Sequence, residues 1–188
     1  MFLKTRLGLL TIIGIVLLFP SLSFAQKNLA EALPDVDGWK KGEVVKYATE
    51  ELGYSVGYQS AEGGTVTIYF YHGGVKNIPD GADNRIVKAE LEKAESDIIA
   101  YGEMGYYQNV KKMSSGIDML GLENGIVETQ HANFDIEVRG VKMTSDIYLF
   151  GKDKYFVKFR ASRRKGDGIT PNKVFADFMA KMDEYFSE

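Results

Sequence analysis

The chain has 188 residues, with 23 basic and 26 acidic side chains, a formal net charge of −3 and no cysteine. The absence of cysteine excludes a disulfide, a thiolate metal site and a cysteine nucleophile. The mild acidity argues against general nucleic-acid binding, which usually shows a basic face. The length suits one ordinary domain with a sizeable core.

The first 25 residues have the pattern of a secretory signal peptide. Lys4 and Arg6 form a basic start, and an uncharged run follows over residues 7–19. Ser23 and Ala25 place small residues where a signal peptidase reads them. The run is shorter than the roughly 20 residues that a membrane-spanning helix needs. We therefore expect cleavage after Ala25 and a periplasmic or extracellular protein without a membrane span; the alternative is an uncleaved anchor.

Cleavage of these 25 residues would leave 163 of the 188, with 21 basic and 26 acidic side chains and a net charge of about −5. We divide the mature chain into a lead-in segment over residues 26–42 and one domain over residues 43–188. No linker, internal repeat or low-complexity segment divides the latter range.

The first part of this domain predicts strands. They are expected over residues 43–49, 54–60 and 65–71, with turn chemistry at Glu62-Gly63-Gly64 between the last two. In the third strand, apolar side chains alternate with tyrosine and threonine, which is the period of a strand with two different faces. Tyr69 and Tyr71 lie on the face opposite the aliphatic one.

A long helix is expected next, over residues 83–103, with Asp80 or Asp83 as its amino-terminal cap. Its apolar side chains recur at steps of four and three residues and form one continuous stripe. The members of the stripe are Val87, Leu91, Ala94, Ile98 and Tyr101.

The second half predicts a short strand over residues 107–113, a glycine-rich loop over 114–125 and a three-stranded antiparallel meander over 134–164. A closing helix begins at Thr170-Pro171. It buries an apolar stripe, whose members are Phe175, Phe178, Met179 and Met182, with Phe186 at the end. Strands and helices do not alternate as βαβ units, so the sequence predicts an α+β fold. In it, an antiparallel sheet is packed by a long central helix and a C-terminal helix.

The succession GYSVGYQSAEGGTVTIYFYHGG, helix, strand, three-stranded meander and closing helix resembles the α/β/α sandwich of the PsbP type. It also resembles small uncharacterised secreted bacterial proteins of similar element order. The resemblance covers most of residues 43–186 and rests on element order rather than on a signature motif. It implies a binding or accessory role and transfers no catalytic residue.

One motif suggests catalysis. Ser55 lies in Gly-Tyr-Ser-Val-Gly, which matches the G-x-S-x-G elbow of serine hydrolases, and His131 could act as its base. The elbow requires a helix directly after the serine, whereas a turn and a strand follow here. The two histidines, His72 and His131, lack the spacing of a metal site. We expect no catalytic residue, no metal and no cofactor.

Two groups of residues are candidates for binding. Arg160, Arg163 and Arg164 form the strongest basic cluster and could hold a phosphate or a carboxylate. Tyr69 and Tyr71 belong to an aromatic second face, which is either covered by a helix or exposed for recognition.

The leading interpretation is an exported, non-catalytic binding or accessory protein for an unknown protein or small-molecule ligand. The alternatives are a small serine hydrolase using Ser55 with His131, and an envelope assembly or stress factor.

Overall fold

The computed structural model describes residues 29–121, 124–166 and 173–188. The predicted signal peptide and the Thr170-Pro171 start of the last helix lie outside these residues. In the part that is described, no helix is long and apolar enough to cross a membrane.

Seven antiparallel strands of the described chain form one sheet, in the order β1-β2-β3-β7-β6-β5-β4. Their bounds are β1 Trp39–Lys46, β2 Tyr54–Ser60, β3 Thr65–Tyr71, β4 Gln108–Met119, β5 Glu128–Val138, β6 Val141–Lys152 and β7 Tyr155–Arg164. The chain builds one edge first, crosses to the other edge through a helix, and returns through the meander to pair β7 with β3. The antiparallel α+β prediction is confirmed.

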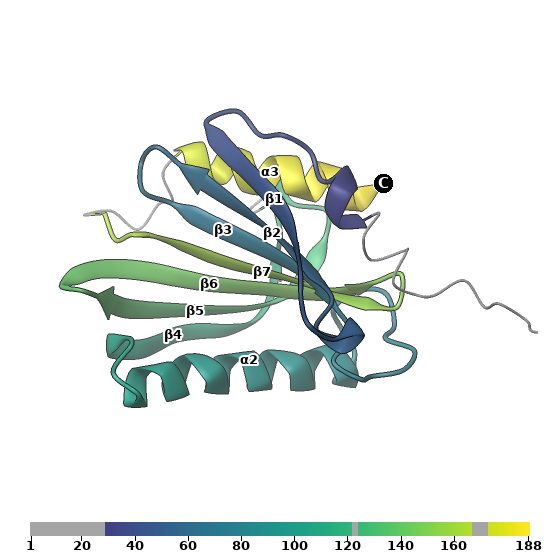
Figure 1. Cartoon of the computed structure of the whole chain (residues 1–188), viewed down its shortest axis with the longest axis horizontal. Coiled ribbons are helices and arrows are strands. Elements are labelled where there is room, and N and C mark those ends of the chain that lie inside the picture. The colour runs from purple at the N-terminus through teal and green to yellow at the C-terminus, as the bar shows by residue number, and fades with distance from the viewer. Residues whose placement is uncertain (1–28, 122–123, 167–172) are drawn as a thin grey trace, which may run out of the picture.

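The two long helices, α2 (Arg85–Glu103) and α3 (Lys173–Ser187), lie on opposite sides of the sheet, and η1 (Glu50–Leu52) is a short turn between β1 and β2. In Figure 1, β1, β2 and β3 run obliquely to β4, β5 and β6, which is the twist expected of a large sheet. Because of this twist, a straight helix covers only part of either face.

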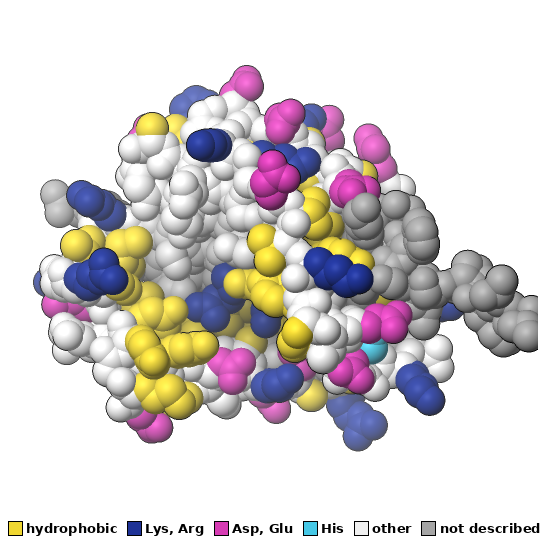
Figure 2. Space-filling view, viewed as in Figure 1, with side chains coloured by type: hydrophobic (Ala, Val, Ile, Leu, Met, Phe, Trp, Pro, Cys, Tyr) yellow, Lys and Arg dark blue, Asp and Glu magenta, His cyan; other side chains and the backbone are white. Residues whose placement is uncertain are grey.

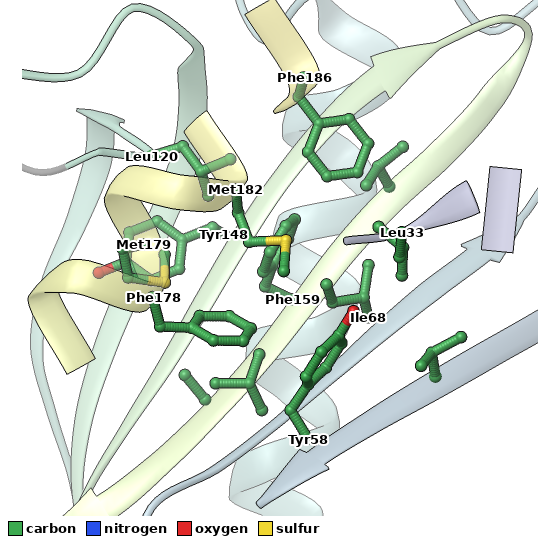
Figure 3. Close-up of a cluster of buried hydrophobic side chains, with 14 of the residues drawn as sticks. Leu33, Tyr58, Ile68, Leu120, Tyr148, Phe159, Phe178, Met179, Met182 and Phe186 are labelled. Carbon is green, nitrogen blue, oxygen red and sulfur yellow. The ribbon is translucent and has the colours of Figure 1, made fainter. Parts of the chain in front are cut away.

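The larger core lies between α3 and the sheet. Phe178, Met179, Met182 and Phe186 point from the helix onto the strands, where Figure 3 shows Phe159 among their neighbours. These helical side chains are at most 4% exposed, as the apolar stripe predicted. Residues of the predicted lead-in contribute to the same core, among them Ala30, Leu33 and Val36.

The second core lies under α2. Four members of the predicted stripe, Val87, Leu91, Ala94 and Ile98, are buried against residues of β5 and β6. The fifth, Tyr101, is 46% exposed, because α2 reaches its last turn there and Tyr101 contacts Tyr106 and Tyr107 instead.

The cap of α2 differs from the prediction. Asn84, rather than Asp80 or Asp83, caps the helix, and its side-chain oxygen accepts from the Val87 amide at 3.0 Å. Asp83 instead pairs with Lys88.

The boundaries of three strands also differ. β5 begins at Glu128, whereas the meander was expected to begin at residue 134. β1 covers residues 39–46 rather than 43–49, and Trp39 at its start is held by a hydrogen bond from Nε1 to the Val174 carbonyl. β4 runs through the first half of the expected glycine loop to Met119. Pairing with β5 satisfies the backbone of this Ser-Gly segment, so it forms a strand despite its weak intrinsic preference.

Candidate functional site

Helix α2 leaves part of its sheet face uncovered. Its main backbone contacts are with β4, β5 and β6, while of β7 and β3 the core under α2 includes Phe156 and Tyr71, where β7 begins and β3 ends. Figure 2 shows a hollow between α2 and the β1–β3 half of the molecule, with basic side chains at its floor and hydrophobic side chains on both sides.

The register of β7 identifies what faces this hollow. Val157, Phe159 and Ala161 belong to the core under α3. Lys158 and Arg160 alternate with them and therefore point to the α2 side. Lys158 lies between Tyr69 of β3 and Leu149 of β6, and Arg160 lies between Thr67 and Ile147. We call this surface the α2–β7 groove; it consists of Tyr47, Thr67, Tyr69, Tyr71, Tyr107, Lys158 and Arg160.

Lys158 is half-buried among aromatic rings. Its Nζ atom lies 4.8 Å from the centroid of Tyr71 and 5.3 Å from that of Tyr69. No carboxylate of a described residue lies within salt-bridge distance of it. Burial lowers the pKa of Lys158; the charge of Glu90 opposes this effect and that of Arg160 adds to it.

Glu90 of α2 is the acidic residue with the largest effect on Lys158, and its carboxylate already has other partners. Its carboxylate accepts a hydrogen bond from the Tyr71 hydroxyl at 2.8 Å and lies 3.8 Å from Lys93. Burial, followed by the charge of Glu90, raises the pKa of Tyr71, so its hydroxyl stays protonated and keeps donating. This hydrogen bond ties β3 to α2 and fixes the Tyr71 ring against Lys158.

Arg160 has an unsatisfied donor. Among the described residues, only two buried side-chain polar atoms lack a hydrogen-bond partner, Arg160 Nε and Ser145 Oγ. Ser145 and Arg160 are on neighbouring strands and on the same sheet face, since Ser145 pairs with Ser162, two residues after Arg160. Buried polar atoms are seldom left unpaired, so these two atoms are exceptions beside the floor of the groove, but neither is open to solvent.

The aromatic wall of the groove is continuous. Tyr47 and Tyr69 stack with centroids 6.4 Å apart and planes inclined by 19°. Burial, and then the proximity of Tyr47, raises the pKa of Tyr69, while Arg160 acts in the opposite direction. Tyr107 packs on the neighbouring core at the α2 side. The wall can therefore contact a flat or apolar group with neutral rings.

The structure brings together three of the five predicted binding residues: Tyr69, Tyr71 and Arg160. Arg163 lies on the opposite face, where its guanidinium sits 4.3 Å over the Phe175 ring of α3. Arg164 is exposed at the end of β7, next to the turn at Gly63. The basic cluster of the sequence is thus divided between two faces by strand alternation.

Arg163 belongs to a separate buried network. The Asp146 carboxylate, only 3% exposed, accepts from Arg163, from His131 Nε2 at 3.1 Å and from Asn133 Nδ2 at 2.6 Å. Burial alone would raise the pKa of Asp146, but the hydrogen bond from His131 and the charge of Arg163 outweigh it and hold the pKa below its ordinary value. The network joins β5, β6 and β7 under α3.

The structure does not bring Ser55 and His131 together. Ser55 pairs with Tyr69 on the α2 side, and its Oγ lies 3.0 Å from the Tyr47 hydroxyl. His131 lies on the α3 side, stacked on Tyr148 at 4.4 Å. Three strands separate β2 from β5, so the two side chains cannot act on one substrate. Within the described ranges, no histidine and carboxylate side chains are grouped in a way that could hold a metal ion.

No protein-family model, curated protein or solved structure matches this chain. The groove is therefore interpreted from its own residues.

Sequence reasoning had not singled out Lys158, Tyr47 or Ser145. Alternation placed Lys158 on the polar face of its strand. The sequence around β7 contains no signal that α2 leaves the Lys158 side chain uncovered.

Proposed function

We propose that the chain is an exported, non-catalytic binding protein that holds an anionic ligand in the α2–β7 groove. The observation that carries the proposal is the pair Lys158 and Arg160. Both are half-buried and adjacent on one strand face, and no carboxylate of a described residue lies within salt-bridge distance of either. The element order that resembles the PsbP type supports the same non-catalytic interpretation.

The physical reason is desolvation. A cation that is partly removed from water loses hydration, and an opposite charge with hydrogen bonds offsets that loss. The guanidinium of Arg160 presents paired donors that suit a carboxylate, sulfonate or phosphate. The rings of Tyr69 and Tyr47 provide a surface for the rest of the ligand. The groove thus fits a small anion with a flat or apolar body.

Naphthalene-2-sulfonate is a suitable probe because it combines an anion with a flat ring system. Binding to the mature chain is measured by titration calorimetry and by NMR shifts of the tyrosine rings. Lys158→Met and Arg160→Met are each expected to weaken binding about tenfold or more, as loss of a charged contact does. Lys154→Met is the matched control, since its side chain is exposed in the turn before β7.

The uncharged analogue 2-naphthalenemethanol tests the role of charge. The unmodified protein is expected to bind this analogue more weakly than the sulfonate. The affinity for the analogue is expected to be the same in the Arg160→Met variant as in the unmodified protein. The proposal is refuted if the sulfonate does not bind at millimolar concentration, or if Lys154→Met weakens binding as much as Lys158→Met.

A further inference from the structure

The side chain of Lys158 differs in its surroundings from the exposed lysines of the chain. Its same-face neighbours across the strands are Tyr69 and Leu149, and along β7 they are Phe156 and Arg160. None of these four strand neighbours is acidic, Leu149 and Phe156 are at most 1% exposed, and the only charge among them is a second cation. Glu90 and Asp97 of α2 act on the Lys158 pKa in the opposite direction, but burial is the largest effect and the net pKa is lowered. An amine in such surroundings is desolvated and lies beside a like charge, and these are the two conditions that activate a lysine nucleophile.

The amine also remains reachable. Lys158 is half-buried rather than enclosed, and the floor of the groove lies beside α2 rather than beneath it. Its two ring contacts, with Tyr69 and Tyr71, hold Nζ over the aromatic wall. A small molecule that enters the groove therefore meets Nζ and Arg160 together.

We propose that Lys158 captures a small carbonyl compound that carries a carboxylate, such as a 2-oxo acid, as a reversible imine, with Arg160 holding the carboxylate. This rests on the proposed anion-binding role of the groove and specifies its ligand class. Residues two apart on a strand have Cα atoms roughly 6.6 Å apart and point to the same side. Two long side chains at that spacing can converge on adjacent carbonyl and carboxylate groups of one molecule.

The step is balanced without any co-reactant. The neutral amine of Lys158 attacks the carbonyl carbon and forms a carbon–nitrogen bond, and the nitrogen releases two protons that balance the two taken up by the carbonyl oxygen. Loss of that oxygen as water gives the imine, and addition of water restores the amine and the carbonyl compound. Lowering of the Lys158 pKa by burial increases the fraction of amine that can attack.

Reductive trapping with glyoxylate tests the proposal in the mature protein. Cyanoborohydride reduces the imine of glyoxylate to an N-carboxymethyl lysine, which peptide mass spectrometry assigns to a residue. Lys158 is expected to be modified faster than Lys154 in the same sample at neutral pH. The ratio of the Lys158 rate to the Lys154 rate should increase about tenfold for each pH unit by which the Lys158 pKa is lowered. The pH at which the Lys158 rate levels off should likewise be lower than that for Lys154.

An uncharged aldehyde separates the two roles. Arg160→Met is expected to slow the modification of Lys158 by glyoxylate more than its modification by propanal, because both reactions lose the activating charge of Arg160 but only glyoxylate also loses a carboxylate partner. Lys158→Met abolishes modification at this position with both. Modification of Lys158 no faster than that of Lys154 overturns the inference, and needs no variant that could misfold. If naphthalene-2-sulfonate still binds in that case, anion binding stands alone. If Lys158 reacts selectively but the sulfonate does not bind, the amine is reactive and the anion-binding proposal fails.

Discussion

Substitution of Asp146 by asparagine tests whether the buried network under α3 stabilises the fold. The change keeps the shape of the side chain but removes the charge that faces Arg163. Arg163 is 17% exposed and also packs on Phe175, so it cannot turn freely into water. Breaking a buried ion pair by removing one partner costs about 3–5 kcal/mol, because the remaining charge is left uncompensated.

The matched control is Asp177→Asn. Asp177 pairs with Lys173 at 2.6 Å, but both side chains are more than half exposed, so its loss should cost about 0–1 kcal/mol. Urea unfolding of the mature chain measures both changes. For a chain of this length, the larger one corresponds to a fall in Tm of roughly 6–20 °C. A loss below about 1 kcal/mol for Asp146→Asn, equal to that of the control, would refute this account of the network.

The same substitution predicts a pH dependence with a definite sign. The pKa of Asp146 is lower in the folded state than in the unfolded state, so its contribution is fully present above the unfolded value, about 3.9. It is lost as the pH falls through the folded value. The stability difference between the unmodified protein and Asp146→Asn should therefore be smaller in acid than at neutral pH; a difference that grows in acid contradicts the assignment. Adding Arg163→Met should recover part of the loss, because the uncompensated charge is removed.

Three further predictions concern export and the two cores. Intact mass of the exported protein should correspond to a chain that begins at Gln26, and a mass that retains the first 25 residues would reject signal cleavage. Alanine at Leu91 under α2, or at Phe159 under α3, should each lower the free energy of unfolding in urea by roughly 2–5 kcal/mol, because both side chains are at most 4% exposed. Losses under about 0.5 kcal/mol at both sites would contradict their core placement. Truncation before Thr170 removes α3 and exposes the larger core, so the truncated chain should aggregate or unfold partly; a monomer with an unchanged Tm would show that α3 is dispensable.

Local sequence patterns were sufficient for elements whose signals are short-range. β2 and β3 have the predicted bounds, because a glycine turn joins two runs of strand-forming residues. The burial of α2 and α3 follows from stripes at helical spacing, and every predicted member is buried except Tyr101. The strand expected over residues 107–113 is present, but the second half of β4 was wrongly predicted as a loop because its Ser-Gly composition favours one, whereas its backbone pairs with β5.

The candidate site was only partly predictable for the same reason. The sequence indicated Arg160, Tyr69 and Tyr71, and it indicated that polar and apolar side chains alternate along β7. Strand alternation already places Arg163 and Arg160 on different faces, but the acid that pairs with Arg163 lies on β6, and no local pattern indicates that partner.

The sequence by itself determined the α+β class, the absence of cysteine chemistry, the apolar faces of both helices and the alternation that places Lys158 and Arg160 on one side of a strand. These follow from composition and from periodicities of two and 3.6 residues, which operate over a few neighbours. The tertiary structure decided the pairing of β7 with β3 and the position of α2 over β4, β5 and β6. Sheet order and helix position depend on contacts between segments far apart in the chain, and it is these contacts that leave Lys158 and Arg160 facing an open groove.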